Sequence, residues 1–293
     1  MSSSPSRYRQ DAASDYRHRF HAGNVGDVWK HCVLVEVLRR TAAAHDGIVY
    51  VESHAGEGCY VLGPTGEWTE GIGRLWGADG VPVADDAVGR YLRLARALAS
   101  GEARPDRYPG SPLLARAALP ETATLALWEA DAASCERLAT ALAPNEPRVA
   151  ITCGDGLGPL SEAVAAAEAR GAGVVALVDP PFTRKSDWLA VPDAVIAAAA
   201  ASARATLLLW YPLKSLTRPN AMIARFKAAG VAASVAELVT TPLEHQRSRL
   251  NGSGLVLVRP PDGALAAIAA AAPILGARLA TRPGAWSLRL ASW

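Results

Sequence analysis

Paired cysteines and long hydrophobic segments are both missing from this sequence. Its four cysteines are scattered along the chain, at Cys32, Cys59, Cys135 and Cys153, and no two of them form a CxxC pair. This spacing argues against a disulfide framework and against a zinc site, so we expect free thiols in a reducing compartment. The polar N-terminus has no apolar core for a signal peptide, and Pro273 closely follows the alanine-rich run 264–272. We therefore expect a cytoplasmic protein without a membrane segment.

A strong excess of charge of either sign is missing too. The 293 residues carry a net charge of +2, so a nucleic-acid-binding surface would have to be a local patch. Half of the residues are hydrophobic and 20% are charged, which is typical of a globular chain with a large core and one or two domains. Residues 1–15 are rich in serine, and we expect them to form a disordered tail.

The third absence is a complete G-x-G-x-x-G motif. The segment IVYVESHAGEG (48–58) is typical of the first strand of a nucleotide-binding fold followed by a glycine turn. Gly56 and Gly58 stand where the backbone of such a fold must approach a ligand closely. The missing phosphate-binding spacing counts against a dinucleotide or a nucleoside triphosphate as the ligand.

One stretch, GVVALVDPPFTRKSDW (173–188), organises the rest of the chain. The apolar run 174–178 has the length and the β-branched content of a strand buried on both faces of a parallel sheet. Pro180 and Pro181 cannot continue a central strand, so the chain must leave the sheet at Asp179. In open α/β sheets, ligands bind outside the carboxyl ends of the strands. The sequence therefore predicts an acid, a stiff diproline and the ring of Phe182 at the ligand site.

This set of residues suits methylation of an exocyclic amine on a nucleobase, whose delocalised lone pair is a poor nucleophile. The Asp179 carboxylate and the Pro180 carbonyl can both accept hydrogen bonds from the amine and hold its nitrogen in a more nucleophilic form. Pro181 stiffens the turn that aims the carbonyl, and Phe182 offers a face on which an extruded base can stack. The alternative is a capped strand end with a surface aromatic residue.

Acidic residues also follow the second and third predicted strands. Glu129 ends the strand 124–128, where it can bind both ribose hydroxyls of a nucleoside. Asp155 follows the strand 148–153 and lies between glycines, which let an adenine ring lie against the backbone while the acid reaches its amine. Each acid alone is more often a cap or turn residue. At successive strand ends with Asp179, they predict a nucleoside-containing cofactor.

The remaining elements complete an α/β pattern with an interruption. A fifth strand is expected at 206–210, ending at Tyr211-Pro212, and the apolar segments 231–239 and 254–258 are candidates for further strands. Glycines and prolines break the strand–helix alternation between 59 and 112, around a helical piece at 88–98. We therefore expect residues 59–112 to form an inserted, mostly helical subdomain, with residues 16–58 and 113–293 as the main domain. Ser111-Pro112 resembles a helix start.

The segment YRHRFHAGNVGDVWKH (16–31) is rich in rings and basic side chains. We expect Asp27 to cap a helix over 28–40, which places Lys30 and His31 near its N-terminal end. Four histidines, His18, His21, His31 and His54, match no familiar spacing of metal ligands, so we expect no metal. An ordinary structural hydrogen bond is the alternative for each of them.

Several basic residues stand near the expected ligand site. They are Arg17, Arg19, Lys185, Lys214, Arg218, Arg247 and Arg249. They can form one phosphate-binding face around the crevice, or they can be scattered, solvated charges.

Together these pieces resemble the RlmJ family, the 23S ribosomal RNA adenine-N6 methyltransferases. The resemblance runs from Tyr16 to about Val258 and rests on seven features: YRHRFHAGNVGDVWKH (16–31), SHAGEG (53–58), YPGSP (108–112), Glu129, GDG (154–156), DPPF (179–182) and LWYP (209–212). The opening motif is far more specific than DPPF. Two positions depart from the family pattern: Phe182 replaces a tyrosine, which keeps stacking and loses a hydroxyl, and Glu52 replaces an aspartate.

The resemblance implies a class I, Rossmann-like methyltransferase fold with an inserted helical subdomain, S-adenosylmethionine as the cofactor, and 23S ribosomal RNA as the partner. It implies that the cofactor contacts His31, His54, Ser111, Glu129, Asp155, Gly156 and Asp179, besides Gly56 of the glycine turn. It also implies that Tyr16, His18 and Lys30 lie near the target adenosine and that Asp179 is the catalytic acceptor, within the set Asp179, Pro180, Pro181 and Phe182. We expect a monomer that needs neither a metal nor a covalent enzyme intermediate.

Two rival functions remain at this point. A DNA adenine-N6 methyltransferase would share the DPPF chemistry, but residues 59–112 look short for a domain that reads duplex sequence. A nucleotide-binding protein or oxidoreductase on a Rossmann-like sheet would need a phosphate-cradling glycine loop, and it would leave the diproline without a role.

Overall fold

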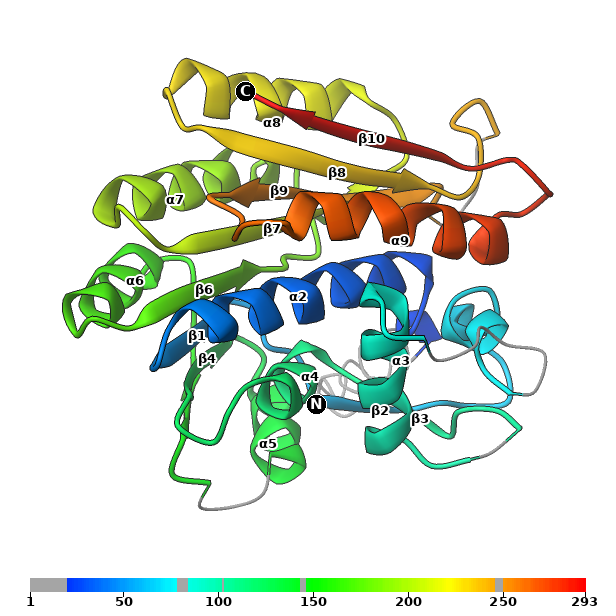
Figure 1. The fold of residues 1–293 in the computed structure, drawn as a ribbon, viewed down its shortest axis with the longest axis horizontal. Coiled ribbons are helices and arrows are strands. Elements are labelled where there is room, and N and C mark those ends of the chain that lie inside the picture. The colour runs from blue at the N-terminus through cyan, green and yellow to red at the C-terminus, as the bar shows by residue number, and fades with distance from the viewer. Residues whose placement is uncertain (1–19, 78–83, 102, 143–145, 246–249) are drawn as a thin grey trace, which may run out of the picture.

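The computed structural model describes residues 20–77, 84–101, 103–142, 146–245 and 250–293 (Figure 1). The expected tail at 1–15 lies outside these residues, as do Tyr16, His18 and four of the basic residues named above, Arg17, Arg19, Arg247 and Arg249.

The described chain is built on an eight-stranded sheet with the strand order β10-β8-β9-β7-β6-β1-β4-β5. The strands are β1 (Ile48–Glu52), β4 (Thr124–Glu129), β5 (Val149–Cys153), β6 (Gly173–Val178), β7 (Thr206–Leu213), β8 (Ala233–Val239), β9 (Gly252–Val258) and β10 (Ser287–Ser292). Strands β5, β4, β1, β6 and β7 are parallel, and β9, β8 and β10 continue the sheet in antiparallel pairs. The strand order reverses between β1 and β6, which is where ligands bind in doubly wound sheets.

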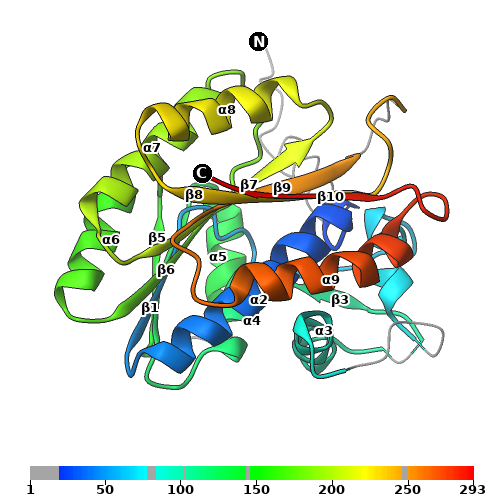
Figure 2. The same cartoon turned by 45° about the horizontal axis from the view of Figure 1, so that its top comes forward.

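Helices cover both faces of the sheet (Figures 1 and 2). On one face lie α2 (Val25–Ala44), α4 (Ser111–Ala118), α5 (Ala132–Ala141) and α9 (Ala264–Leu279), and on the other α6 (Leu160–Ala169), α7 (Asp187–Ala201) and α8 (Thr217–Ala228). Alternate residues of each strand belong to the two cores: in β6, Val175 and Leu177 face α2, whereas Val174, Ala176 and Val178 face the core formed with α6, α7 and α8. The expected α/β class is confirmed.

Residues 59–112 contain more than helix. Strands β2 (Cys59–Val61) and β3 (Arg107–Pro109) pair as a small antiparallel sheet, and the 3-10 helices η1 (Glu67–Thr69) and η2 (Ile72–Leu75) and the helix α3 (Ala87–Leu98) lie between them. The α3 helix is tied to α2 through Arg90, whose guanidinium binds the buried carboxylate of Glu36 at 2.9 Å. Helix α4 starts at Ser111 with Pro112 in its first turn, as predicted.

The first helix begins earlier than predicted. Asn24, not Asp27, is the N-cap of α2, and its Oδ1 accepts hydrogen bonds from the backbone N–H groups of Gly26 and Asp27 at 2.9 and 3.0 Å. The Asn24 Nδ2 donates to Glu67 at 3.0 Å, which fixes the side chain in the capping position. Asp27 instead accepts from the backbone N–H of Gly23 and from Lys30, at 2.9 Å each. The Asp27 carboxylate is therefore free of the capping role and available to Lys30.

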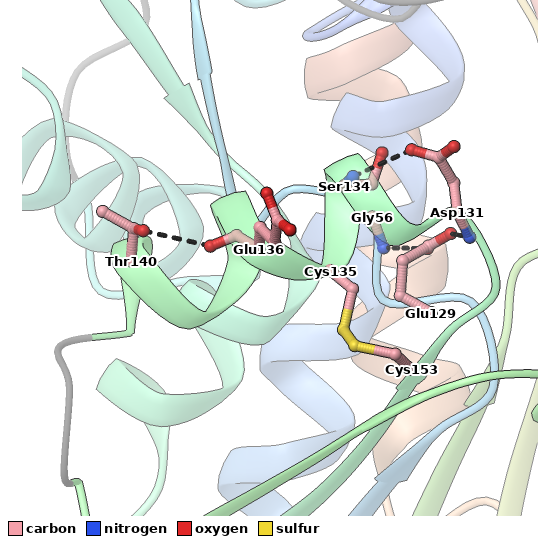
Figure 3. The surroundings of a disulfide bond; sticks show 8 residues. All are labelled: Gly56, Glu129, Asp131, Ser134, Cys135, Glu136, Thr140 and Cys153. Carbon is pink, nitrogen blue, oxygen red and sulfur yellow. Dashed lines mark hydrogen bonds between the residues drawn. A yellow bond between two sulfur atoms is a disulfide. The ribbon is translucent and has the colours of Figure 1, made fainter.

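The expectation of four free thiols was wrong. Cys135 in α5 and Cys153 at the end of β5 form a disulfide, with their Cα atoms 5.8 Å apart (Figure 3). Their separation of 18 residues gives no local signal, but β5 pairs with β4, and α5 follows β4 directly. The fold thus returns the two cysteines to the same place. Cys32 and Cys59 are free thiols.

Strand β7 also runs further than predicted. It continues through Tyr211 and Pro212 to Leu213, because β9 pairs with it along this whole length. Gly254 of β9 lies opposite Tyr211, where a side chain would collide with the tyrosine ring. None of the helices in the described ranges is long and apolar enough to span a bilayer.

Candidate active site

The predicted acids converge on one edge of the sheet. The parallel pairing aligns Glu52 of β1 with Leu177 of β6 and with Leu127 of β4, and it aligns Glu129 with Cys153. Asp179 and Asp155 follow the ends of β6 and β5. The side chains that sequence reasoning put at strand ends are therefore neighbours along the edge where the strand order reverses.

Asp179 forms a buried ion pair with Lys30 of α2. The Lys30 Nζ lies 2.5 Å from Asp179 Oδ2 and 2.9 Å from Asp27 Oδ1. Burial would lower the pKa of Lys30, but the charges of Asp179 and Asp27 outweigh it and hold this pKa above its ordinary value. Burial raises the pKa of Asp179, and the Lys30 ammonium opposes this rise. One cation is thus held between two carboxylates.

Trp210 also contacts this ammonium. The Lys30 Nζ is 5.6 Å from the centre of a ring of Trp210, within the range of a cation–π contact. The Trp210 Nε1 is buried, and it donates a hydrogen bond to no atom of the described residues. Sequence reasoning noted the LWYP motif but assigned Trp210 no role, because nothing in a strand residue's neighbours shows which buried group it will face.

His31, the residue after Lys30, has a hydrogen-bond partner at one of its two ring nitrogens only. Its Nδ1 lies 2.7 Å from the Tyr108 hydroxyl, which lies 2.9 Å from the Tyr91 hydroxyl. Burial, followed by the nearby Lys30 charge, lowers the pKa of His31 to about 3, so the imidazole is neutral. Its Nε2 is buried and has no partner in the described part of the chain.

Glu52 and Ser111 meet in the core below this edge. The Ser111 hydroxyl donates to Glu52 at 2.5 Å, and the Tyr50 hydroxyl donates to the other carboxylate oxygen at 2.9 Å. Glu52 is fully buried, and burial raises its pKa to about 8. Ser111 thus binds Glu52, an acid to which the sequence analysis assigned no function.

Glu129 joins two loops at the end of β4. Its carboxylate accepts from the backbone N–H of Gly56 at 2.8 Å and from that of Asp131 at 2.9 Å (Figure 3). Gly56 has a positive φ of 63°, a conformation that favours glycine. Asp131 in turn caps α5 through the backbone N–H of Ser134, at 2.8 Å. The carboxylate is therefore held in one orientation by two backbone donors.

Asp155 and Gly156 form the adjacent loop after β5. The Asp155 carboxylate accepts from the backbone N–H groups of Leu157 and Gly158 at 3.2 and 3.0 Å. A Cβ on Gly156 would collide with the Ser53 carbonyl oxygen, so this loop packs tightly against the end of β1. His54 lies nearby, with Nδ1 at 2.9 Å from the Ser53 hydroxyl, and burial lowers the pKa of its imidazole.

Phe182 is not the open platform that the sequence suggested. Its side chain is 7% exposed and packs against Trp188 of α7, with ring centres 4.4 Å apart. A base can stack on this face only if Trp188 moves. Phe182 also has a positive φ of 48°, unusual for a bulky residue, directly after the buried Pro180 and the exposed Pro181. Sequence reasoning gave Trp188 no role.

Three of the predicted basic residues lie in the described part of the chain. Lys185, Lys214 and Arg218 are exposed and follow β6 and β7, on the edge that carries Asp179.

The chain matches one protein family and is similar to two named proteins. Residues 45–292 match the family described as ribosomal RNA large subunit methyltransferase D, RlmJ. Two proteins named ribosomal RNA large subunit methyltransferase J are similar to the chain: the Escherichia coli protein is 32% identical and the Haemophilus influenzae protein 31% identical, each match covering 84% of this chain and 87% of the relative.

A solved structure has the same fold. The crystal structure of a Legionella pneumophila protein superposes with a TM-score of 0.81 at 24% sequence identity, over 93% of this chain and 98% of that one.

Proposed function

Because this chain belongs to the RlmJ family of ribosomal RNA large subunit methyltransferases, we propose that it methylates N6 of one adenine in 23S ribosomal RNA with S-adenosylmethionine as the donor. The observation that supports this reaction is the Lys30–Asp179 ion pair at the point where the strand order reverses. The chain is a methyltransferase by its family, and the roles of its individual residues are part of the proposal.

Lys30 leaves one oxygen of Asp179 for the substrate. The ammonium holds Oδ2, and Oδ1 accepts no hydrogen bond from the described residues. An ionised carboxylate only accepts hydrogen bonds, so Oδ1 suits an N–H of the adenine amine. The Pro180 carbonyl is the second acceptor for this amine. By binding two of its hydrogens, the pair would turn the nitrogen lone pair toward the methyl group.

The residues at the neighbouring strand ends fit a nucleoside-containing cofactor. Glu129 is oriented by two backbone donors, and each of its oxygens keeps a lone pair with which to accept a ribose hydroxyl. The unpartnered His31 Nε2 is a buried polar atom that needs a ligand. In the loop after β5, Asp155 would accept from the adenine amine and Gly156 would let the adenine ring lie against the backbone. S-adenosylmethionine would supply the methyl group from its sulfonium centre; the S–CH3 bond breaks, the sulfur leaves as the thioether of S-adenosylhomocysteine, and the methylated nitrogen releases one proton.

The protein contributes mainly positioning to such a reaction. Transfer of a methyl group to an amine is a direct displacement, and holding the two reactants in line removes much of its entropic barrier. Lys30 and Asp27 fix the Asp179 carboxylate, and the diproline fixes the carbonyl next to it. By resemblance, Tyr16, His18 and Lys30 lie near the target adenosine, and the exposed Lys185, Lys214 and Arg218 would bind RNA phosphates.

The test uses large-subunit ribosomal RNA from cells that lack this protein. The RNA is incubated with the purified protein and methyl-labelled S-adenosylmethionine, beside an Asp179→Asn variant. An Asp193→Asn variant is the matched control, because Asp193 lies on α7 in an exposed ion pair with Arg225. We expect labelled N6-methyladenosine with the wild type and the control, and a loss of at least about a hundredfold with Asp179→Asn.

Duplex DNA is the second substrate in this experiment. Label in DNA and not in RNA would contradict the proposal and favour a DNA adenine methyltransferase. Equal activity of Asp179→Asn and the wild type would contradict the role given to Asp179. Measured binding of the cofactor to each variant separates a loss of chemistry from a loss of the cofactor site.

A further inference from the structure

Some buried polar atoms of the described residues have no hydrogen-bond partner. Outside the Glu57–Arg137 ion pair, the described residues contain three of them, and all three are ring nitrogens: His31 Nε2, Trp188 Nε1 and Trp210 Nε1. His31 adjoins Lys30 in α2, Trp188 packs on Phe182, and Trp210 lies beneath the Lys30 ammonium. Native proteins pair nearly all of their buried polar groups, so each exception calls for an explanation, and a bound ligand is one.

Trp210 is the one of these residues whose ring contacts Lys30, the ion-pair partner of Asp179. Strands β6 and β7 pair Val178 with Leu209, so Trp210 in β7 is level with Asp179, the first residue after β6. Both contact Lys30: Nζ is 2.5 Å from Asp179 Oδ2 and 5.6 Å from the centre of a ring of Trp210. The indole ring and the Asp179 carboxylate are therefore neighbours of the same cation.

The position of the indole is fixed by packing. A Cβ on Gly26, in the first turn of α2, would lie 3.3 Å from Trp210 Cζ2, so the glycine lets the helix sit close against the indole. Trp210 is half-buried and belongs to both cores, in the centre of the sheet between β6 and β9. An indole held in this way presents its N–H in one direction, and an indole N–H can only donate.

We propose that Trp210 Nε1 donates a hydrogen bond to a ring nitrogen of the target adenine and so orients the base in the active site. This inference rests on the proposed function. An adenine amine is flanked by two acceptors, N1 and N7, whereas its own hydrogens go to Asp179 and the Pro180 carbonyl. A donor-only group beside an acceptor-only group matches this edge of adenine. The base would then be fixed in its plane, with N6 at Asp179 Oδ1.

The test removes the proposed hydrogen bond in two ways, by changing the base and by changing the protein. An RNA oligonucleotide is copied from the segment that the wild-type enzyme methylates, and its target adenosine is replaced by 1-deazaadenosine or by 7-deazaadenosine. Each analogue keeps the amine and loses one ring acceptor. We expect one analogue to lower the wild-type kcat/KM about tenfold to a hundredfold. We expect Trp210→Phe to lower kcat/KM for adenosine by a similar factor and to show no further loss with that analogue.

Trp293→Phe is the matched control. The Trp293 Nε1 already donates to the Val231 carbonyl at 2.9 Å, at the end of the outermost strand β10. This variant should keep the wild-type response to both analogues. The dissociation constant of S-adenosylmethionine should be unchanged in Trp210→Phe, because the indole contacts the base and not the cofactor. If Trp210→Phe does not fold, Trp210→Leu, which also lacks the donor, takes its place.

Two outcomes overturn the inference and leave the proposed function standing. One is a wild-type enzyme that methylates RNA containing 1-deazaadenosine and RNA containing 7-deazaadenosine both as fast as RNA containing adenosine. The other is a Trp210 variant that shows the same analogue penalty as the wild type. If the wild-type protein fails to methylate unmodified ribosomal RNA, both the proposed function and this inference are wrong.

Discussion

The Lys30 ammonium lies 2.5 Å from the Asp179 carboxylate, although the two residues are 149 positions apart. The contact joins the first described helix to the end of the central strand β6, and both side chains are largely buried, at 7% and 16% exposure. A second carboxylate, Asp27, binds the same ammonium from within α2. The reactive acid of the proposed site is thus part of a three-charge cluster with a net charge of −1.

Lys30→Met should destabilise the protein strongly. It leaves two carboxylates buried without their cation, and breaking a buried ion pair in this way typically costs about 3–5 kcal/mol. The free energy of unfolding, measured with a chemical denaturant, should fall by an amount of this order. Methyl transfer should also be lost, because Asp179 is then no longer held in its orientation.

The double variant Asp27→Asn, Lys30→Met is the control for this effect. Removing the Asp27 charge should recover part of the lost stability, because one fewer carboxylate is left unpaired, and it should not recover activity. A Lys30→Met protein as stable as the wild type would show that the cluster does not hold this region together.

The stability of the protein should depend on pH through Glu52. Burial raises the pKa of Glu52 to about 8, whereas its ordinary value is 4.5. The folded state therefore keeps a proton that the unfolded chain has lost, and this contribution is complete below pH 4.5 and disappears as the pH rises through 8. Between pH 6.5 and 8 the free energy of unfolding should fall by about 1–2 kcal/mol.

Glu52→Gln isolates this contribution from the other titrating groups. Glutamine resembles the protonated acid and does not titrate, so the difference between the two proteins should change with pH in the same window. The lowered pKa of His31 acts in the opposite direction, but only below its ordinary value of 6.5, which is why the window starts there. Parallel curves for wild type and Glu52→Gln would contradict the raised pKa.

Reduction of the disulfide should destabilise the fold. The Cys135–Cys153 bond closes a loop of 18 residues. A cross-link of this span lowers the entropy of the unfolded chain and so stabilises the folded state by about 3 kcal/mol. Denaturation with and without a thiol reductant measures this difference. A Cys135→Ser, Cys153→Ser protein should have the same stability as the reduced wild type, and the reductant should not change it. An unchanged wild-type midpoint would mean that the bond does not form in solution.

Two glycines of one loop should respond differently to the same substitution. A Cβ on Gly156 would collide with the Ser53 carbonyl and lie 2.7 Å from Trp128 Cβ, whereas a Cβ on Gly154 has nothing within 4 Å. Gly156→Ala must displace the loop that carries Asp155 and should weaken binding of S-adenosylmethionine by about tenfold or more. Gly154→Ala should bind it as the wild type does. Equal affinities would contradict the place of this loop in the cofactor site.

The strand ends and the start of α4 could be predicted because they depend on neighbouring residues. An apolar run of strand length followed by a turn residue or a proline is a property of neighbouring positions, so the ends of β1, β4 and β6 could be predicted. Because parallel strands end at the same edge, the sequence alone was enough to place Glu129, Asp155 and Asp179 at the same edge of the sheet. The start of α4 at Ser111-Pro112 followed in the same way.

Competition between similar local signals explains one error. Asn24 and Asp27 are both good helix caps, and the sequence alone does not rank them. The structure favours Asn24 because Glu67, 43 residues away, holds its amide, while Gly23 and Lys30 occupy the Asp27 carboxylate. The cap was decided by groups that no local pattern contains.

Short stretches of chain were sufficient to specify the strands, their acidic ends and the family, because each of these depends on neighbouring positions. The meetings between side chains came from the packing of the folded chain: Lys30 with Asp179, Trp210 with Lys30, Trp188 with Phe182, and Cys135 with Cys153. Such contacts depend on how each helix crosses the sheet and which face each strand residue takes. That packing brings together residues distant in sequence, so these contacts cannot be predicted from a local sequence pattern.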